Sequence, residues 1–164
     1  MKKLSELSLF AAIVSWAGIV GAVLHLHIAT MPPLLSNLPE SSIVVTGTYG
    51  VKDADFWKII HPITIVSTML ALVINWKSRE RRKFIGVAMA IYAIALVATA
   101  VYFVPELMAF FASSQNTSVT AAEWLERGQR WQYLSWIRGL GMVAGFVSLL
   151  LALKQNPSSG SSGS

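Results

Sequence analysis

Long apolar stretches constrain this chain more than any other feature of its sequence. Four of them cover residues 7–30, 55–76, 84–112 and 131–153. A helix needs about 20 predominantly apolar residues to cross a hydrocarbon core of roughly 30 Å. No stretch alternates apolar and polar residues with the period of two that a membrane β-strand requires. The sequence therefore predicts an all-α integral membrane protein, an antiparallel four-helix bundle that forms one domain over residues 1–155.

Composition agrees with this class, since 54% of the 164 residues are hydrophobic and 13% are charged. A soluble domain of this length would need more charge to cover its surface. The chain has no cysteine, which excludes disulfides, thiolate metal sites and cysteine nucleophiles. Lys2 and Lys3 precede the first apolar stretch as in a signal peptide, but that stretch is too long and lacks a cleavage site, so we expect it to be retained. Residues 156–164 read as a flexible tail or cloning scar.

The net charge of +5 has a membrane explanation and does not predict a nucleic-acid partner. Basic residues concentrate in the short loop 77–83 and at the chain ends, whereas the opposite loops carry the acidic residues. Cytoplasmic loops of membrane proteins carry such an excess of lysine and arginine. We therefore expect both termini and the 77–83 loop to be cytoplasmic, in a bacterial inner or plasma membrane. The lipid bilayer is then the principal partner.

Local signals set the expected helix ends. The first helix should run from Leu4 to Thr30 and stop at Met31-Pro32-Pro33, because proline cannot continue a helix. Asp53 or Asp55 is a candidate N-cap for the second helix. The loop 34–53 leaves open whether Ser41–Thr48 forms a short strand or a re-entrant piece.

The fourth helix has a clearer start, because Thr120 and Glu123 form a capping-box pattern.

Counted inward from the expected outer boundary, one ionisable residue of each helix lies at a depth of about 9–10 Å. These residues are His25, His61, Glu106 and Arg138. A charge in hydrocarbon costs several kcal/mol, so such groups should face one another or a wet cavity. The sequence predicts that they share a pocket below the outer leaflet.

The stripe of small residues on the first helix decides between its two histidines. Ser15, Gly18 and Ala22 lie at helical spacing with His25, so His25 should face the bundle interior and His27 the interface. Trp131, Tyr102 and Arg127 are candidates for substrate contacts at the outer end. Tryptophan is also typical of the membrane interface, which is the alternative reading of Trp131.

Several chemistries fit the pocket. His25, His61 and Glu106 have the ligand types of a two-histidine, one-carboxylate site for iron, copper or zinc. Alternatively, a histidine acts as general base beside Arg138, which would stabilise an enolate or phenolate. A haem between His25 and His61 would leave the glutamate without a role. The structural alternative is a Glu106–Arg138 ion pair that bridges two helices, with the histidines as packing residues.

The fourth helix carries a family resemblance, which rests on Arg130-Trp131-Gln132-Tyr133-Leu134-Ser135-Trp136-Ile137-Arg138 and on the run from Val143 to Leu153. Tyr102–Glu106 and Met31-Pro32 contribute to it. The chain resembles the anthrone-oxygenase-like family of small four-helix membrane proteins. The resemblance implies that Trp131 and Arg138 occupy family positions, while Ser135 stands where the family has asparagine. Some members oxidise anthrones to anthraquinones with oxygen, and the histidines belong to no family signature.

Together these patterns predict a small membrane oxidoreductase or oxygenase that acts on a lipophilic aromatic or quinone-like molecule. His25, His61 and Glu106 would bind a metal or move protons, and Arg138 would hold an anionic oxygen. The alternative is a non-enzymatic membrane protein, either a lipid or small-molecule binder or an accessory subunit. In that case the buried charges only hold the bundle together.

Overall fold

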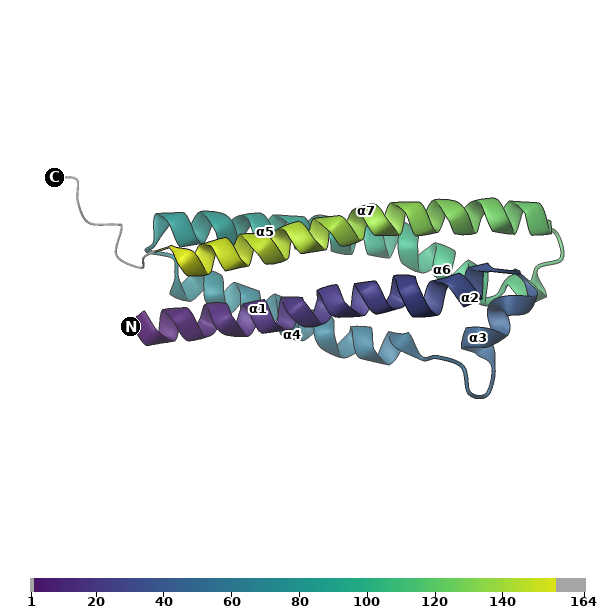
Figure 1. Ribbon diagram of the computed structural model, residues 1–164, viewed down its shortest axis with the longest axis horizontal. Helices are drawn as coiled ribbons and strands as arrows, with labels where there is room; N and C mark the ends of the chain where they lie inside the picture. The colour runs from purple at the N-terminus through teal and green to yellow at the C-terminus, as the bar shows by residue number, and fades with distance from the viewer. Residues whose placement is uncertain (1, 156–164) are drawn as a thin grey trace.

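The computed structural model describes residues 2–155, so the predicted tail 156–164 lies outside the described part. Four long helical rods dominate it (Figure 1). The first and third rods each contain a π-helical turn. In chain order, the rods are α1 (Lys2–His25) continued through Leu26–Thr30 into α2 (Met31–Leu35), α4 (Asp53–Ile74), α5 (Arg79–Ala98) continued through Thr99–Phe103 into α6 (Val104–Phe111), and α7 (Ala121–Lys154). The predicted all-α class is confirmed, and all four rods are long and apolar enough to cross a membrane.

The rods pack as an antiparallel bundle in which α1 lies between α4 and α7, and α7 lies against α5. The bundle is closed least tightly between α4 and α5, which contact each other over a shorter stretch than the other neighbours. The N-terminus and the described end of α7 lie at the same end of the bundle (Figure 1). A cleft lies between α4 and α5, where the bundle is least tightly closed.

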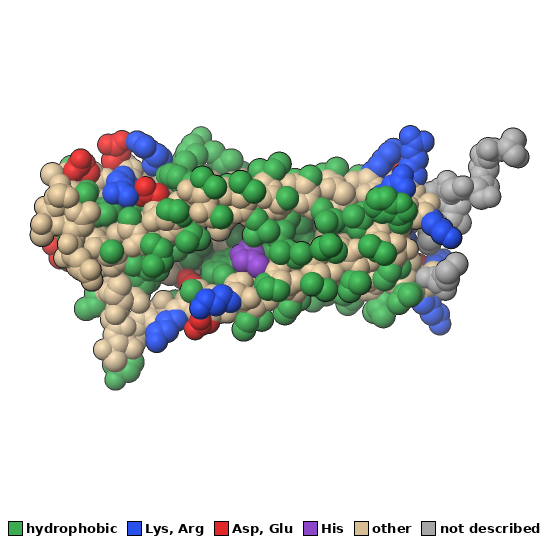
Figure 2. Space-filling model, turned by 180° about the vertical axis from the view of Figure 1, so that it is seen from behind, with side chains coloured by type: hydrophobic (Ala, Val, Ile, Leu, Met, Phe, Trp, Pro, Cys, Tyr) green, Lys and Arg blue, Asp and Glu red, His purple; other side chains and the backbone are tan. Residues whose placement is uncertain are grey.

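The outer surface of the rods is apolar along the middle of the molecule. Figure 2 shows hydrophobic side chains covering this middle part, while charged side chains gather toward the two ends. Ile59, Val97 and Leu140, for example, are 64%, 63% and 66% exposed. Exposing so much apolar surface to water would be unfavourable, whereas contact with lipid is not. The chain is an integral membrane protein.

Three of the four rods are longer than the membrane requires, whereas α4 has 22 residues. With 34 residues, α7 is about 51 Å long at a rise of about 1.5 Å per residue. Because a hydrocarbon core is roughly 30 Å thick, about 20 Å of α7 exceeds it. The charged residues Glu123 and Arg127 lie in the first two turns of α7.

The core depends on a close approach of α1 and α7. Trp16 is fully buried, and its indole nitrogen donates a 3.0 Å hydrogen bond to Thr68 Oγ1 on α4. The Trp16 ring lies so close to the backbone of Gly145 that a Cβ atom there would collide with it. A bulky residue therefore occupies the interior of this layer, and the small residue opposite makes room for it.

This arrangement corrects the predicted interior stripe of the first helix. The buried positions of α1 include Leu9, Ala12, Trp16, Ile19 and Val23. The stripe of small residues lies next to this face and meets α4, where Ser15 Oγ is 2.9 Å from Ser67 Oγ. Small residues marked a helix contact correctly, but they did not mark the centre of the bundle.

Two helix ends also differ from the predictions. The prolines after Met31 do not stop the first rod, because the π-helical turn Leu26–Thr30 precedes them and they fall in the first turn of α2, where a proline needs no amide partner. The cap of α4 is Lys52, without a side-chain hydrogen bond, so neither predicted aspartate caps this helix. The described chain contains no strand at Ser41–Thr48, which instead includes α3 (Ile43–Thr46). The capping box of α7 is confirmed.

We expect Gly145→Ala to lower the free energy of unfolding by about 1–3 kcal/mol, because its methyl group collides with a fully buried ring. Gly86→Ala is the matched control, since nothing lies within 4 Å of the added Cβ and alanine favours the helix. Reversible unfolding in mixed micelles, followed by circular dichroism, measures both. Equal stability of the two variants would contradict the tight Trp16–Gly145 contact.

Candidate functional site

The main candidate site surrounds the half-buried side chain of Arg138 on α7. Its Nη1 donates a 2.7 Å hydrogen bond to Thr99 Oγ1 of the π-helical turn after α5, and its Nη2 donates a 2.9 Å bond to Ser135 Oγ. The guanidinium carbon lies 4.0 Å from the centroid of the Phe103 ring. Among residues 2–155 no carboxylate forms an ion pair with it. The predicted Glu106–Arg138 pair is therefore not formed.

A histidine and a tyrosine form the second part of this site. His61 Nδ1 lies 2.7 Å from the Tyr92 hydroxyl oxygen, and the His61 ring stacks at 5.3 Å on Trp57. Tyr92 is only 6% exposed, whereas His61 remains partly accessible. Tyr92 and Thr99, the partners of His61 and Arg138 on the third rod, are seven residues apart, about 10 Å along the helix. The predicted meeting of His61 and Arg138 stays a prediction.

The first helix contributes the other histidine than the one predicted. His25 is exposed, whereas His27 is 2% exposed and its Nδ1 lies 2.7 Å from the Val23 carbonyl oxygen. Since a carbonyl only accepts hydrogen bonds, Nδ1 carries a proton. The assignment of His25 to the interior was wrong, because the interior stripe of α1 passes through Val23 and reaches His27 one turn later.

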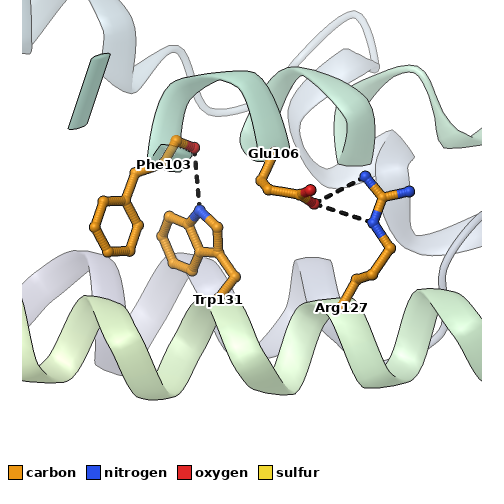
Figure 3. A network of polar contacts seen from close by, with 4 residues as sticks. All are labelled: Phe103, Glu106, Arg127 and Trp131. Carbon is orange, nitrogen blue, oxygen red and sulfur yellow. Dashed lines mark hydrogen bonds and ion pairs between the residues drawn. The ribbon is translucent and has the colours of Figure 1, made fainter. Parts of the chain in front are cut away.

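Glu106 lies elsewhere, in an ion pair with Arg127 (Figure 3). Its Oε2 accepts hydrogen bonds of 2.8 and 3.1 Å from Arg127, and the two side chains are 25% and 33% exposed. Arg127 precedes Arg138 by eleven residues on α7, a distance of about 16 Å along the helix. The prediction of one shared depth for Glu106 and Arg138 was wrong.

The register of α7 explains that error. The depth count treated Trp131 as the membrane boundary, but Trp131 is 1% exposed and its indole nitrogen donates a 3.1 Å bond to the Phe103 carbonyl oxygen (Figure 3). Glu106, three residues beyond Phe103, lies opposite Arg127 in the second turn of α7. Arg138 falls opposite Thr99, two turns deeper.

The predicted substrate-binding residues hold the bundle together or lie outside the Arg138 site. Trp131 anchors α7 to the backbone of the third rod, and Arg127 is occupied by Glu106. Tyr102 is partly buried, and its ring packs at 5.1 Å against Phe103. Trp131 and Tyr102 both pack against the Phe103 ring, and the Arg138 guanidinium lies over that same ring.

The metal prediction does not fit the geometry. Over the part of the chain that the structure describes, no three histidine, aspartate or glutamate side chains form a group that could hold a metal ion. His25, His61 and Glu106 are therefore not a ligand set for iron, copper or zinc. The haem alternative fits no better, because His25 is exposed and the His61 ring lies between Trp57 and the Tyr92 hydroxyl.

A cleft between α4 and α5 adjoins the site. It has a volume of about 160 Å³, and its lining is almost entirely apolar. Tyr92 belongs both to the cleft and to the hydrogen bond with His61. The complete lining consists of Trp16, Ile65, Thr68, Met89, Tyr92, Ala93 and Leu96.

The opposite end of the bundle holds a second buried arginine, which sequence reasoning missed. Arg81 is 1% exposed and donates hydrogen bonds to Ser5 Oγ (2.7 Å), Asn75 Oδ1 (3.1 Å) and the Gln155 carbonyl oxygen (2.8 Å). The whole basic loop 77–83 had been interpreted as solvated. Arg81 instead joins α1, α5 and the ends of α4 and α7. Its spacing along α5 with the buried Ile85 and Ala88 was the available signal.

No family model, curated protein or solved structure matches this chain. The fold therefore defines its class by itself: a four-helix integral membrane bundle in which, over residues 2–155, Arg138 forms no ion pair with a carboxylate. The resemblance of the fourth helix to the anthrone-oxygenase-like family remains a hypothesis.

We expect Arg81→Gln to lower the free energy of unfolding by about 1–3 kcal/mol, because it leaves buried acceptors without their donor. Arg79→Gln removes the same charge from the same helix at an exposed position and should have no measurable effect. Thermal unfolding in detergent compares the two variants. Equal losses would show that net charge, and not the buried network, controls stability at this end.

Proposed function

We propose that this chain is a small membrane oxygenase that binds a lipophilic aromatic molecule through a phenol, enol or carbonyl oxygen. The observation that carries the proposal is the Arg138 cation. It has no carboxylate partner in the described chain, and its bond to Thr99 lies two helical turns from the His61–Tyr92 pair along the third rod. An ionisable group in a membrane-spanning helix is a functional-site hypothesis by default.

The chemistry follows from the donors and acceptors present. Arg138 has five N–H groups, and Thr99 and Ser135 accept from only two of its nitrogens, so N–H groups remain for a substrate oxygen. A negative charge that develops on this oxygen would be stabilised by the guanidinium in a medium of low dielectric constant. The site therefore favours the enolate or phenolate form of its ligand.

His61 is the proposed general base. With its Nδ1–H donating to the Tyr92 oxygen, the lone pair of Nε2 is free to accept a proton from the substrate. Tyr92 would hold this tautomer, and Trp57 would hold the ring plane. Both support an orientation in which one histidine nitrogen faces the ligand.

The resemblance of Arg130–Arg138 to the anthrone-oxygenase-like family supplies the reaction. Removal of a proton from the CH₂ group of an anthrone gives an electron-rich enolate, and dioxygen is the oxidant. In the net reaction this CH₂ becomes a carbonyl, one oxygen atom enters the product, and the other leaves as water. Ser135, at the position of the family's asparagine, would orient Arg138 by accepting its hydrogen bond.

His61→Gln should lower the rate of anthrone-dependent oxygen uptake about 100-fold, because it removes the general base. Arg138→Gln should raise KM, because Arg138 contacts the substrate oxygen in the ground state. It should also lower kcat, because this contact strengthens in the transition state as negative charge develops on the oxygen. The control is His25→Gln, an exposed histidine of the same bundle, which should retain the wild-type rate. Protein in lipid nanodiscs and an oxygen electrode, corrected for spontaneous oxidation, measure these rates.

The non-enzymatic alternative has its own support, because the Arg138–Thr99 hydrogen bond joins α7 to the third rod. If wild-type protein shows no oxygen uptake above the spontaneous rate, and Arg138→Gln only lowers the unfolding temperature, the oxygenase proposal is wrong. Arg138 would then be a structural residue of a lipid or small-molecule binder or an accessory subunit.

We propose that the 77–83 loop faces the cytoplasm, on the basis of its lysines and arginines. Because the chain has no cysteine, single cysteines report the topology directly. We expect Thr117→Cys in intact cells to react with a membrane-impermeant maleimide, and Lys83→Cys to react only after lysis. The reverse labelling would place the Arg138 site near the inner leaflet.

A further inference from the structure

We infer that the ligand of the Arg138 site is an amphiphile with one apolar tail, and that this tail lies in the cleft between α4 and α5. The inference rests on the proposed function and adds the substrate class and the route of entry. The polar head would lie at Arg138 and His61. The cleft, with a volume of about 160 Å³, would hold the part of the tail next to the head.

The cleft and the polar site adjoin each other along α5. Tyr92 contacts His61 through its hydroxyl group, while the same residue lines the cleft. On α5, Leu96 lines the cleft, and Thr99, one turn farther along, accepts the hydrogen bond from Arg138. On this side of the bundle, a ligand head at Arg138 would be one helical turn from the nearest cleft residue.

The two parts also lie in the order that a membrane amphiphile needs. On α4, the exposed Lys58–Asp55 pair lies one turn from His61 on the side of the charged α3 end. The cleft residues Ile65 and Thr68 lie on the other side, about 6 and 10 Å from His61 along the helix. The head is thus near the charged boundary, and the tail points to the middle of the bilayer, as lipid tails do.

The opening of the cleft indicates entry from the lipid. The contact between α4 and α5 is short, and Ala93 on the rim of the cleft is exposed on the apolar surface of the bundle. A ligand dissolved in the bilayer reaches the site from the side and keeps its tail out of water. The cleft fits a phenol or quinone ring that carries one alkyl or prenyl chain.

The hydrophobic effect contributes little to the binding of this tail. Lipid is as apolar as the cleft, so transfer of a tail from bilayer to cleft gives little hydrophobic free energy. On a scale of mole fraction in the lipid, we therefore expect tailed and tailless probes to bind wild-type protein with similar affinity. A side chain that fills the cleft should then act against the tailed probe alone.

The test measures binding of 2-methyl-1,4-naphthoquinone, with and without a prenyl chain, by quenching of tryptophan fluorescence in nanodiscs. Trp57 stacks on His61, so a quinone at the site quenches it. Ala93→Leu fills the cleft from α5 and should weaken the prenylated probe about tenfold, while the tailless probe keeps its affinity. Ile65→Phe should do the same from α4.

The matched control is Ala90→Leu, the same change at an exposed position of α5 that does not line the cleft, and it should leave both affinities unchanged. Ala93→Leu variants that bind both probes as wild type does, or that weaken both equally, would overturn the tail position. Loss of the tailless probe on Arg138→Gln would still support the head site. Failure of wild-type protein to bind either quinone would overturn the proposed function itself.

A long-chain fatty acid, used as a further probe, distinguishes a carboxylate head group from an aromatic one. If only the fatty acid binds, and Ala93→Leu weakens it while Ala90→Leu does not, the tail position is supported and the aromatic head is overturned. Selective binding of the prenylated quinone supports both parts of the inference.

Discussion

Inside a bilayer no water is present to hydrogen-bond the peptide groups, and this constraint decides the architecture of the chain. Helices satisfy their backbone internally, so apolar side chains can face lipid along the whole rod. What then holds the rods together is close packing and a small number of polar contacts. The Trp16–Gly145 contact is the tightest example, and the Trp16–Thr68 hydrogen bond fixes the same ring to a third helix.

Two arginines make polar contacts of this kind between the rods. Arg81 is almost inaccessible, and its Nε and Nη1 donate to hydroxyl, amide and carbonyl oxygens, so its charge serves to join four chain segments. Arg138 is only half-buried and is engaged by two hydroxyls and an aromatic ring. The two residues share a chemistry but differ in access, which is why one reads as structural and the other as a site.

The fold could be predicted from the sequence because hydrophobic length is a strong signal that does not depend on side-chain direction. The site could be predicted only in part. Arg138 does face the third rod, through its bond to Thr99, whereas His25 and Glu106 do not lie where the sequence predicts, because rotation and depth along a rod depend on packing. A one-position error in the interior stripe exchanged His27 for His25. A buried tryptophan taken for an interfacial one displaced the expected depth of Arg138 relative to Glu106 by about two turns.

The comparison of Glu106 with Arg138 shows where function is to be sought. The Glu106–Arg127 pair is partly exposed at the end beyond the apolar belt, where an ion pair adds at most about 1 kcal/mol. Arg138 lies two turns deeper without an acid, where an apolar residue of similar volume would cost less free energy. Hydrogen bonds to Thr99 and Ser135 reduce this cost but use neutral acceptors. Stability alone therefore does not account for a cation at this depth, whereas a ligand that brings its own negative oxygen does.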